Sequence, residues 1–252
     1  MLKLSPAELR TLSENDYPTS DGKPMAETDD HRIIVFDAIN QLMRRYAAEA
    51  NTYVSGNLLL FYEEGNKRRH VSPDVFVVFG VKNGRRPNYL MWEEGKGPDV
   101  VFEITSKTTR KNDTKKKFLL YQDVLKVKEY FLFDPLQDYL KPSMQGYRLL
   151  AGEYRPIPMN DEGRISSELL GLHLERSGKE LRLWDPTTVA WLPSNDEVYG
   201  FERRAKEAIR KIAEAEHKRA EDALEEVARL RELLAKRTPS KNGGNGSSNG
   251  SH

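Results

Sequence analysis

The sequence predicts an α/β fold: a mixed sheet with helices packed on it, extended by added β-strands and one long C-terminal helix. Runs rich in Val, Ile, Phe and Tyr, at about residues 71–80, 100–105 and 129–134, are typical of buried strands. Apolar residues at helical spacing before and between these runs predict the packed helices. From Phe201 to Arg237 the chain has no Gly or Pro and is dominated by Ala, Glu, Lys, Arg and Leu, which predicts the long helix.

The 252 residues are enough for one ordinary domain and an appendage. We expect four parts. Residues 1–26 are a polar segment punctuated by proline, and residues 27–197 form the folded domain. Residues 200–237 form the long helix, and residues 238–252 are a Gly/Ser/Asn-rich tail that we expect to be disordered.

Small polar residues precede the first helix, with Thr28, Asp29 and Asp30 as cap candidates. We expect this helix to cover about residues 31–49. Its apolar residues recur at spacings of three and four and form one core-facing stripe, which consists of Ile34, Val35, Ala38, Ile39, Leu42, Met43 and Tyr46.

Strands are predicted next at residues 52–54 and 58–62. The Glu-Glu-Gly-Asn segment at residues 63–66 is typical of a hairpin turn, and it leads toward the strand at 71–80. Residues 81–97 are polar and are predicted to form a loop over the edge of the sheet.

The apolar run at 100–105 predicts a strand, and a helix is expected over residues 111–123, where Phe118, Leu119 and Leu120 can pack. A strand at 129–134 follows and ends at Pro135. Further β-structure is expected between residues 145 and 185, in the segments 147–150, around 154, 169–174 and 181–184.

Composition excludes several classes of protein. There are no cysteines, so disulfides and thiolate zinc sites are excluded, and a reducing compartment is favoured. No apolar run is long enough for a signal peptide or a membrane span, so we expect a cytoplasmic protein without membrane contact. The net charge is only +1, so any contact with a polyanion must come from local patches.

Two acidic residues lie within apolar strands, Asp74 and Glu103. A buried carboxylate is costly unless it is paired or bound to a metal, and two carboxylates with water suit Mg²⁺. A nearby lysine can orient the attacking water, and either Lys117 or Lys107 is placed for that role. This combination is typical of metal-assisted phosphodiester cleavage. The structural alternative for Asp74 is a strand-entry residue that hydrogen-bonds its own backbone.

A family resemblance is carried by Ser72-Pro73-Asp74-Val75, by residues 98–106 (Pro-Asp-Val-Val-Phe-Glu-Ile-Thr-Ser), and by a set of later positions: Thr108, Thr109, Asp113, Lys117, Tyr121, Glu129 and Tyr130. The chain resembles the Uma-two restriction endonuclease family of the PD-(D/E)XK nuclease superfamily from about residue 27 to residue 183. The resemblance implies a restriction-endonuclease-like core, dependence on Mg²⁺, with Mn²⁺ as a substitute, and DNA as substrate.

In this resemblance the acid of the Pro-Asp element falls on Asp74, the acid of the Glu-x-x-Ser element on Glu103, and the helical lysine on Lys117. The chain departs from a simple Glu-x-Lys pattern, because Thr105 stands where that lysine would be. It also has Lys126 where the family usually carries a glycine before the Glu-Tyr element.

Other residues are candidates for supporting roles. His31, at the start of the first helix, could point toward the site and bind the metal, the water or a phosphate, with a satisfied or exposed helix-start histidine as the alternative. Glu27 is a possible extra acid near that helix. Four cations are candidates for contacts with the DNA backbone, with a solvated helix face as the alternative: Arg110, Lys111, Lys115 and Lys116. His70 belongs either to a phosphate-contacting patch or to a solvated hairpin. For Tyr89 and Trp92 we expect packing under the loop rather than stacking on bases.

The resulting hypothesis is a Mg²⁺-dependent endonuclease that hydrolyses DNA. The alternative is a non-catalytic DNA-binding or protein-interaction module that retains the nuclease fold. In either case the long helix either forms a coiled coil that joins two protomers or remains a solvated helix. The coiled-coil interpretation rests on an apolar seam along this helix: Ile209, Ile212, Ala220, Ala223, Leu224, Val227, Leu230 and Leu234.

Overall fold

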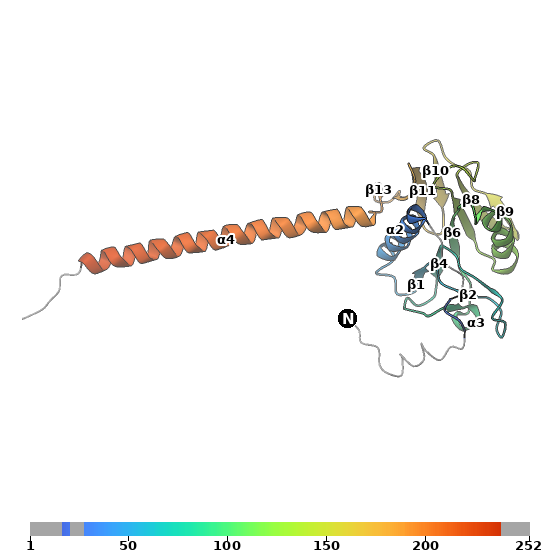
Figure 1. Ribbon diagram of the computed structural model, residues 1–252, viewed down its shortest axis with the longest axis horizontal. Helices are drawn as coiled ribbons and strands as arrows, with labels where there is room; N and C mark the ends of the chain where they lie inside the picture. The colour runs from blue at the N-terminus through green and yellow to red at the C-terminus, as the bar shows by residue number, and fades with distance from the viewer. Residues whose placement is uncertain (1–16, 21–27, 238–252) are drawn as a thin grey trace, which may run out of the picture. The chain divides into compact units, whose positions relative to one another are not determined.

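The computed structural model describes residues 17–20 and 28–237 (Figure 1). The chain divides into two compact units, Met1–Asn195 and Asp196–His252. The first unit is a mixed α/β structure with mixed sheets, and the second contains the long helix, so the predicted fold class is confirmed. Most of the predicted N-terminal segment, Glu27 and the predicted tail lie outside the described residues.

A six-stranded sheet forms the centre of the first unit. Strands β6 and β7 are parallel, whereas the other neighbouring strands run antiparallel. All four inner strands of this sheet, β4, β6, β7 and β8, fall in segments that the sequence predicts as β-structure. Strands β4, β6 and β7 are almost entirely buried, as expected from their continuous apolar sequence. Across the sheet the order is β1 (Thr52–Ser55), β4 (Val75–Phe79), β6 (Val100–Ile104), β7 (Glu129–Phe133), β8 (Met144–Leu150) and β9 (Glu153–Pro156).

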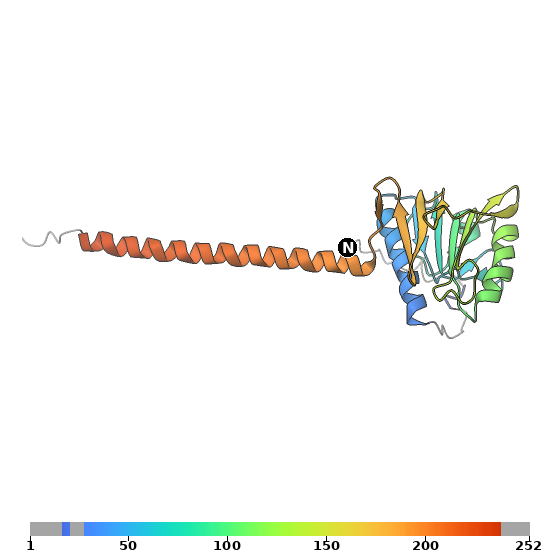
Figure 2. The ribbon, with the colours of Figure 1, turned by 90° about the horizontal axis from the view of Figure 1, so that it is seen from above.

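Each face of this sheet is covered by a different layer, and Figure 2 shows helical segments on both sides. One face packs on helix α2 (Asp29–Arg45) and on a four-stranded sheet. That sheet consists of β10 (Arg164–Ser167), β11 (Leu172–Ser177), β12 (Glu180–Asp185) and β13 (Ala190–Trp191). Strand residues alternate between the faces, because side chains along a strand point in opposite directions.

The opposite face of the sheet packs on two π-helical segments, η1 (Asn112–Lys117) and η2 (Leu120–Val124). A three-stranded sheet covers the same face, in the order β3 (His70–Val71), β2 (Leu60–Phe61) and β5 (Tyr89–Leu90). A short helix, α3 (Met91–Glu94), follows β5.

Helix α2 begins as predicted. The Thr28 hydroxyl accepts a hydrogen bond from the backbone N–H of His31 and caps the first turn. Most of the predicted apolar stripe is buried, but Met43 is 47% exposed and was wrongly assigned to the core. The buried stripe is centred on Val35 and Leu42. Successive residues of an α-helix are rotated by about 100°, so Met43, which follows Leu42, points toward solvent. The helix also ends at Arg45, four residues earlier than expected.

Three other expectations need correction. Residues 81–97 are not only a loop, because they contain β5 and α3, and Tyr89 is fully buried in the core. The predicted strand 71–80 is interrupted at Ser72-Pro73-Asp74, where proline supplies no N–H to a ladder. In the predicted helix 111–123 the backbone is largely π-helical, and Leu119 is 54% exposed rather than packed.

The second unit is dominated by helix α4 (Asn195–Arg237), which confirms the prediction of a long C-terminal helix. All side chains from Phe201 to Lys236 are exposed. Among the described residues, no helix has the length and apolar character needed to span a membrane.

Candidate active site

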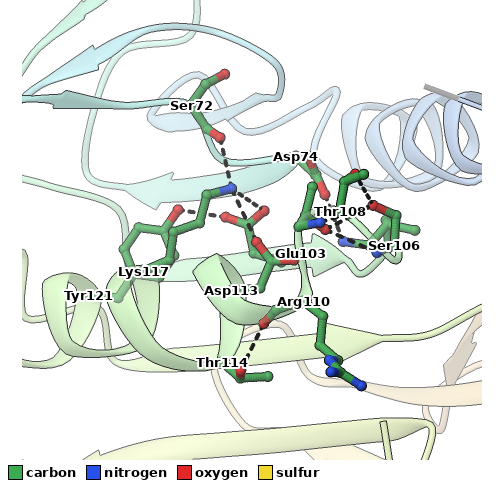
Figure 3. A network of polar contacts seen from close by, with 12 residues as sticks. Ser72, Asp74, Glu103, Ser106, Thr108, Arg110, Asp113, Thr114, Lys117 and Tyr121 are labelled. Carbon is green, nitrogen blue, oxygen red and sulfur yellow. Dashed lines mark hydrogen bonds and ion pairs between the residues drawn. The ribbon is translucent and has the colours of Figure 1, made fainter. Parts of the chain in front are cut away.

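The antiparallel pairing of β4 with β6 brings the two predicted acids together. Val75 pairs with Phe102, so one further step along the same register sets Asp74 opposite Glu103. Directly opposed residues on one face of an antiparallel pair have Cβ atoms about 5 Å apart. Two acids separated by almost thirty residues therefore share one end of the central sheet, on the side covered by the π-helical segments (Figure 3).

Asp74 is held from two sides. Its Oδ2 accepts a hydrogen bond of 2.7 Å from the backbone N–H of Ile104 and lies 3.4 Å from Nε2 of His31. Burial raises the pKa of this carboxyl, but the contact with His31 and the charge of Lys117 outweigh burial and bring the pKa below its usual value. Asp74 therefore carries a negative charge at neutral pH, and His31 lies beside it.

The backbone of Asp74 is positioned by a glycine. A Cβ atom at Gly56 would lie 2.0 Å from the carbonyl oxygen of Asp74, well inside any permitted contact. The neighbouring Asn57 N–H donates to the carbonyl of Pro73 at 2.9 Å. Gly56, which in the sequence indicated only a turn, thus allows the turn after β1 to pack directly against the strand that carries Asp74.

Glu103 is almost completely buried, and both of its carboxylate oxygens are engaged. Oε2 accepts from Nζ of Lys117 at 2.7 Å, and Oε1 accepts from the hydroxyl of Tyr121 at 2.6 Å. Burial raises the pKa of Glu103 well above its usual value. Lys117 opposes this rise, while the negative charges of Asp74 and Asp113 add to it.

The π-helical segments supply the partners of Glu103. Asp113, Lys117 and Tyr121 are spaced by four residues, which places all three on one face of the helical turn. Lys117 Nζ also donates to the carbonyl of Ser72 at 3.3 Å and lies 3.6 Å from Oδ1 of Asp113 (Figure 3). π-Helical turns are rare and occur frequently at functional sites. This segment positions the lysine that the Glu-x-Lys pattern lacks.

Asp113 is the third acid of the site. Its side chain is buried, and among the described residues neither carboxylate oxygen has a hydrogen-bond partner. Burial raises its pKa, and Lys117 counteracts that rise. Lys117 thus contacts two buried carboxylates, Glu103 and Asp113, and interacts electrostatically with a third, Asp74. Burial lowers the pKa of Lys117, but the charges of Glu103, Asp74 and Asp113 exceed this effect and raise it above its usual value.

The excess of negative charge fits a divalent cation. Burial raises the pKa of both Glu103 and Asp113 despite the contacts with Lys117, so an additional positive charge would stabilise these carboxylates. Among the described residues, no group of three or more His, Asp or Glu side chains is arranged so that it could hold a metal ion. Mg²⁺ is often bound by only one or two protein carboxylates and keeps several waters, so Asp74 and Glu103 are the residues that could hold it.

Other predicted candidates lie apart from this cluster. Lys107 is exposed in the turn after β6, where the hydroxyls of Ser106, Thr108 and Thr109 bond to one another, and it has no contact with Glu103 comparable to that of Lys117. The four predicted backbone-binding cations are also exposed: Arg110, Lys111, Lys115 and Lys116. Glu27 lies outside the described residues.

Two members of the site, Asp113 and Tyr121, were noted in the sequence only as part of a spaced pattern and were not assigned roles. The four-residue spacing with Lys117 was the available signal. The carbonyl of Ser72, a third partner of the lysine, has no sequence signal because every residue carries a carbonyl.

Comparison with known proteins gives one family match. The family model described as "Uma2: Putative restriction endonuclease" matches residues 7–181. Among solved structures, the chain is similar to the crystal structure of "a putative nuclease belonging to DUF820 from Anabaena variabilis ATCC 29413", with 17% sequence identity and a TM-score of 0.44. That similarity covers 69% of this chain and 95% of the other. No curated protein matches the chain.

Proposed function

The chain belongs to the Uma2 restriction endonuclease family, and from this premise we propose that it is a Mg²⁺-dependent endonuclease that hydrolyses phosphodiester bonds of DNA. The observation that carries the proposal is the cluster of three buried carboxylates around one lysine at the end of β4 and β6. A purely structural cluster would balance these charges internally. A bound divalent cation would add positive charge beside these carboxylates, as it does in metal-assisted phosphodiester cleavage.

In the proposed mechanism Asp74 and Glu103 hold the metal ion. When bound, the ion lowers the pKa of a water molecule and neutralises charge on the phosphate. Water attacks phosphorus, the bond from phosphorus to the leaving oxygen breaks, and the leaving oxygen takes up a proton. Mn²⁺ has the same charge and accepts the same oxygen ligands, so we expect it to replace Mg²⁺.

Lys117 has a defined part in this mechanism. Its pKa is raised, so its amine remains protonated at neutral pH and cannot act as a general base. It can donate hydrogen bonds to the attacking water or to a phosphate oxygen, and it stabilises the negative charge that develops there. Tyr121 fixes the second oxygen of Glu103, and Asp113 helps to hold the ammonium group in place.

The direct test is nicking of supercoiled plasmid in the presence of Mg²⁺ or Mn²⁺, with the wild type compared with Asp74→Asn. Asp99→Asn is a matched control, because Asp99 also follows a proline at the start of a strand but lies outside the candidate site. Metal-dependent nicking that only Asp74→Asn abolishes would support the proposal. Nicking retained by Asp74→Asn would contradict the assigned site, and absence of nicking by wild type on every DNA form would favour the binding-module alternative.

We further propose that α4 joins two copies of the chain. The helix has 43 residues and exposes large apolar side chains at three- and four-residue spacings, among them Val227, Leu230 and Leu234. Two active sites in one dimer would suit cleavage of two strands. Light scattering of the full-length chain should give the mass of a dimer, and Val227→Glu with Leu234→Glu should give a monomer with unchanged near-UV circular dichroism. A monomeric wild type would contradict this proposal.

A further inference from the structure

A hollow of about 320 Å³ lies beside the candidate active site, between strand β3 and the π-helical segments. Its lining includes Ser72 and Lys117, and these two residues are also joined by the hydrogen bond from Nζ to the Ser72 carbonyl. Because Lys117 also binds Glu103, the hollow borders directly on the proposed catalytic cluster. A molecule that occupies it would therefore be adjacent to the reacting phosphate.

The walls of the hollow combine two chemistries. Leu59, Val71 and Leu120 provide aliphatic surface, whereas Asn112 and Lys116 provide polar and cationic groups. Aliphatic walls favour the flat, weakly polar face of a base or a sugar, and a lysine favours a phosphate. A nucleotide carries all of these groups, so its chemistry matches the lining.

His70 completes the lining and is held in a fixed orientation. Its Nδ1 lies 2.9 Å from the carbonyl oxygen of Lys67, and a carbonyl only accepts, so Nδ1 carries the proton. Its ring also packs against Phe61, with centroids 5.3 Å apart. Nε2 is then the ring nitrogen that can contact a ligand. Three cationic residues, Lys67 to Arg69, directly precede His70 in the exposed turn and extend the basic character of this region.

We propose that this hollow binds one unpaired nucleotide next to the phosphate that is cleaved, and that the preferred substrate is single-stranded DNA or DNA with an unpaired base at that point. The proposal rests on the nuclease function proposed above. The volume is at the lower end of the range of about 300–1,000 Å³ found for small-molecule sites, which suits a nucleotide rather than a base pair. In a continuous duplex, neighbouring bases cover the base faces, and the aliphatic walls would meet only the charged backbone.

Binding measurements without divalent metal separate recognition from cleavage. The probes are one fluorescently labelled DNA sequence as a single strand, as a duplex, and as a duplex with a single unpaired nucleotide. We expect Lys116→Ala to weaken binding of the single strand about tenfold, whereas Lys115→Ala should weaken it about twofold at most. Both lysines are exposed on η1, and each substitution removes one positive charge. Only Lys116 lines the hollow.

A second variant tests the volume of the hollow rather than its charge. Asn112 is exposed at the lining, so Asn112→Met should occupy part of the hollow without disturbing the core and without adding an aromatic ring that could stack on a base. We expect this variant to lose about tenfold in affinity for the single strand and for the duplex with an unpaired nucleotide, and to bind the perfect duplex as the wild type does. A thermal unfolding midpoint equal to that of the wild type would verify that the variant is folded.

The outcomes separate the two proposals. Equal affinity of the wild type for single strand and duplex, or equal losses in Lys116→Ala and Lys115→Ala, would overturn the nucleotide site even if the protein cleaves DNA. Selective binding that depends on Lys116 and Asn112, in a protein that cleaves no DNA with Mg²⁺ or Mn²⁺, would support the nucleotide site and overturn the nuclease function. Selective binding together with preferential cleavage beside an unpaired nucleotide is the expected result.

Discussion

The two ends of strands β6 and β7 bury acids in opposite electrostatic situations. At the starting end, Asp99 accepts from Lys96 at 2.7 Å and from the N–H of Phe79 at 2.8 Å, and Lys128 lies 2.9 Å away. Glu129 at the same end accepts from Arg148, from the hydroxyl of Ser167 and from the N–H of Glu168. Two acids there have three cationic partners.

At the opposite end of these strands, Lys117 interacts with three acids, namely Asp74, Glu103 and Asp113, and His31 lies beside Asp74. The pKa values reflect this difference. Burial raises the pKa of Asp99, but its lysine partners and the Phe79 N–H bring it below its usual value, whereas the pKa values of Glu103 and Asp113 are raised. At that second end only the pKa of Asp74 is lowered, by His31 and Lys117. Buried acids with sufficient cations stabilise the fold, and buried acids with too few are prepared for a ligand.

Of the substitutions at the two ends, Glu103→Gln should have the largest effect on DNA cleavage. The amide keeps the size of the side chain but removes the charge that binds the metal, so we expect DNA cleavage to fall by about 10³-fold. We expect the free energy of unfolding at pH 7 to change little, because removal of a buried charge is offset by loss of its 2.7 Å ion pair with Lys117. Nicking rates and urea denaturation measure the two effects. Cleavage at the wild-type rate would show that the metal is not bound here.

Asp99→Asn should have the reverse effect. It leaves Lys96 and Lys128 without their buried partner, and we expect the free energy of unfolding to fall by about 2 kcal/mol, with cleavage unchanged. Both lysines are partly exposed, so the loss should be smaller than for a fully buried ion pair. Urea denaturation measures the loss, and a large loss of activity in a folded Asp99→Asn protein would remove the distinction between the two ends.

The pH dependence of these variants sharpens the comparison. The folded pKa of Asp99 is lowered, so its stabilisation is present above the unfolded pKa, about 3.9, and disappears as the pH falls through the folded pKa. The folded pKa of Glu103 is raised, so the wild type should lose stability relative to Glu103→Gln as the pH rises from the unfolded pKa through the folded one. Between pH 2 and pH 8, the unfolding free energy of wild type minus that of the variant should therefore increase with pH for Asp99→Asn and decrease with pH for Glu103→Gln.

The sequence identified individual acids but not their grouping. Asp74 and Asp99 both follow a proline at the start of a strand, so neither local sequence separates a metal ligand from a structural ion pair. Glu103 was easier to select, because a carboxylate inside Val-Val-Phe-Glu-Ile has few structural explanations. The pairing of Asp74 with Glu103 depends on strand register, which the turns and the packing of the whole sheet determine.

The sequence also did not predict the local helix geometry. An α-helical pattern predicted the correct location of residues 111–123 but not the π-helical turns, because such turns depend on the tertiary contacts of the segment. The buried position of Asp113 follows from those turns. Its role could therefore not be separated in the sequence from that of an ordinary acid beside a run of lysines.

Asp113→Asn should have a smaller effect than the changes at Glu103 or Asp99. It removes a carboxylate whose oxygens have no hydrogen-bond partner among the described residues, so we expect the free energy of unfolding to rise by about 1 kcal/mol. Lys117 loses its 3.6 Å contact with Oδ1, and we expect cleavage to fall by about tenfold, with metal affinity less affected. Metal titrations of the cleavage rate would separate these effects, and loss of both stability and activity would indicate a structural role.

The smallest effect is expected for Lys107→Ala, which tests the alternative lysine considered for this site. Lys107 is exposed in the turn after β6, and an exposed residue without defined contacts contributes at most about 0.5 kcal/mol, or roughly twofold in rate. Lys117→Met is the matched comparison, because it removes the ammonium that donates to Glu103 while preserving apolar volume. A cleavage rate that Lys107→Ala reduces more than Lys117→Met would mean that the catalytic charge comes from the exposed turn. In that case the contact of Lys117 with Glu103 would only compensate a buried acid, and this end of the strands would resemble the Asp99 end.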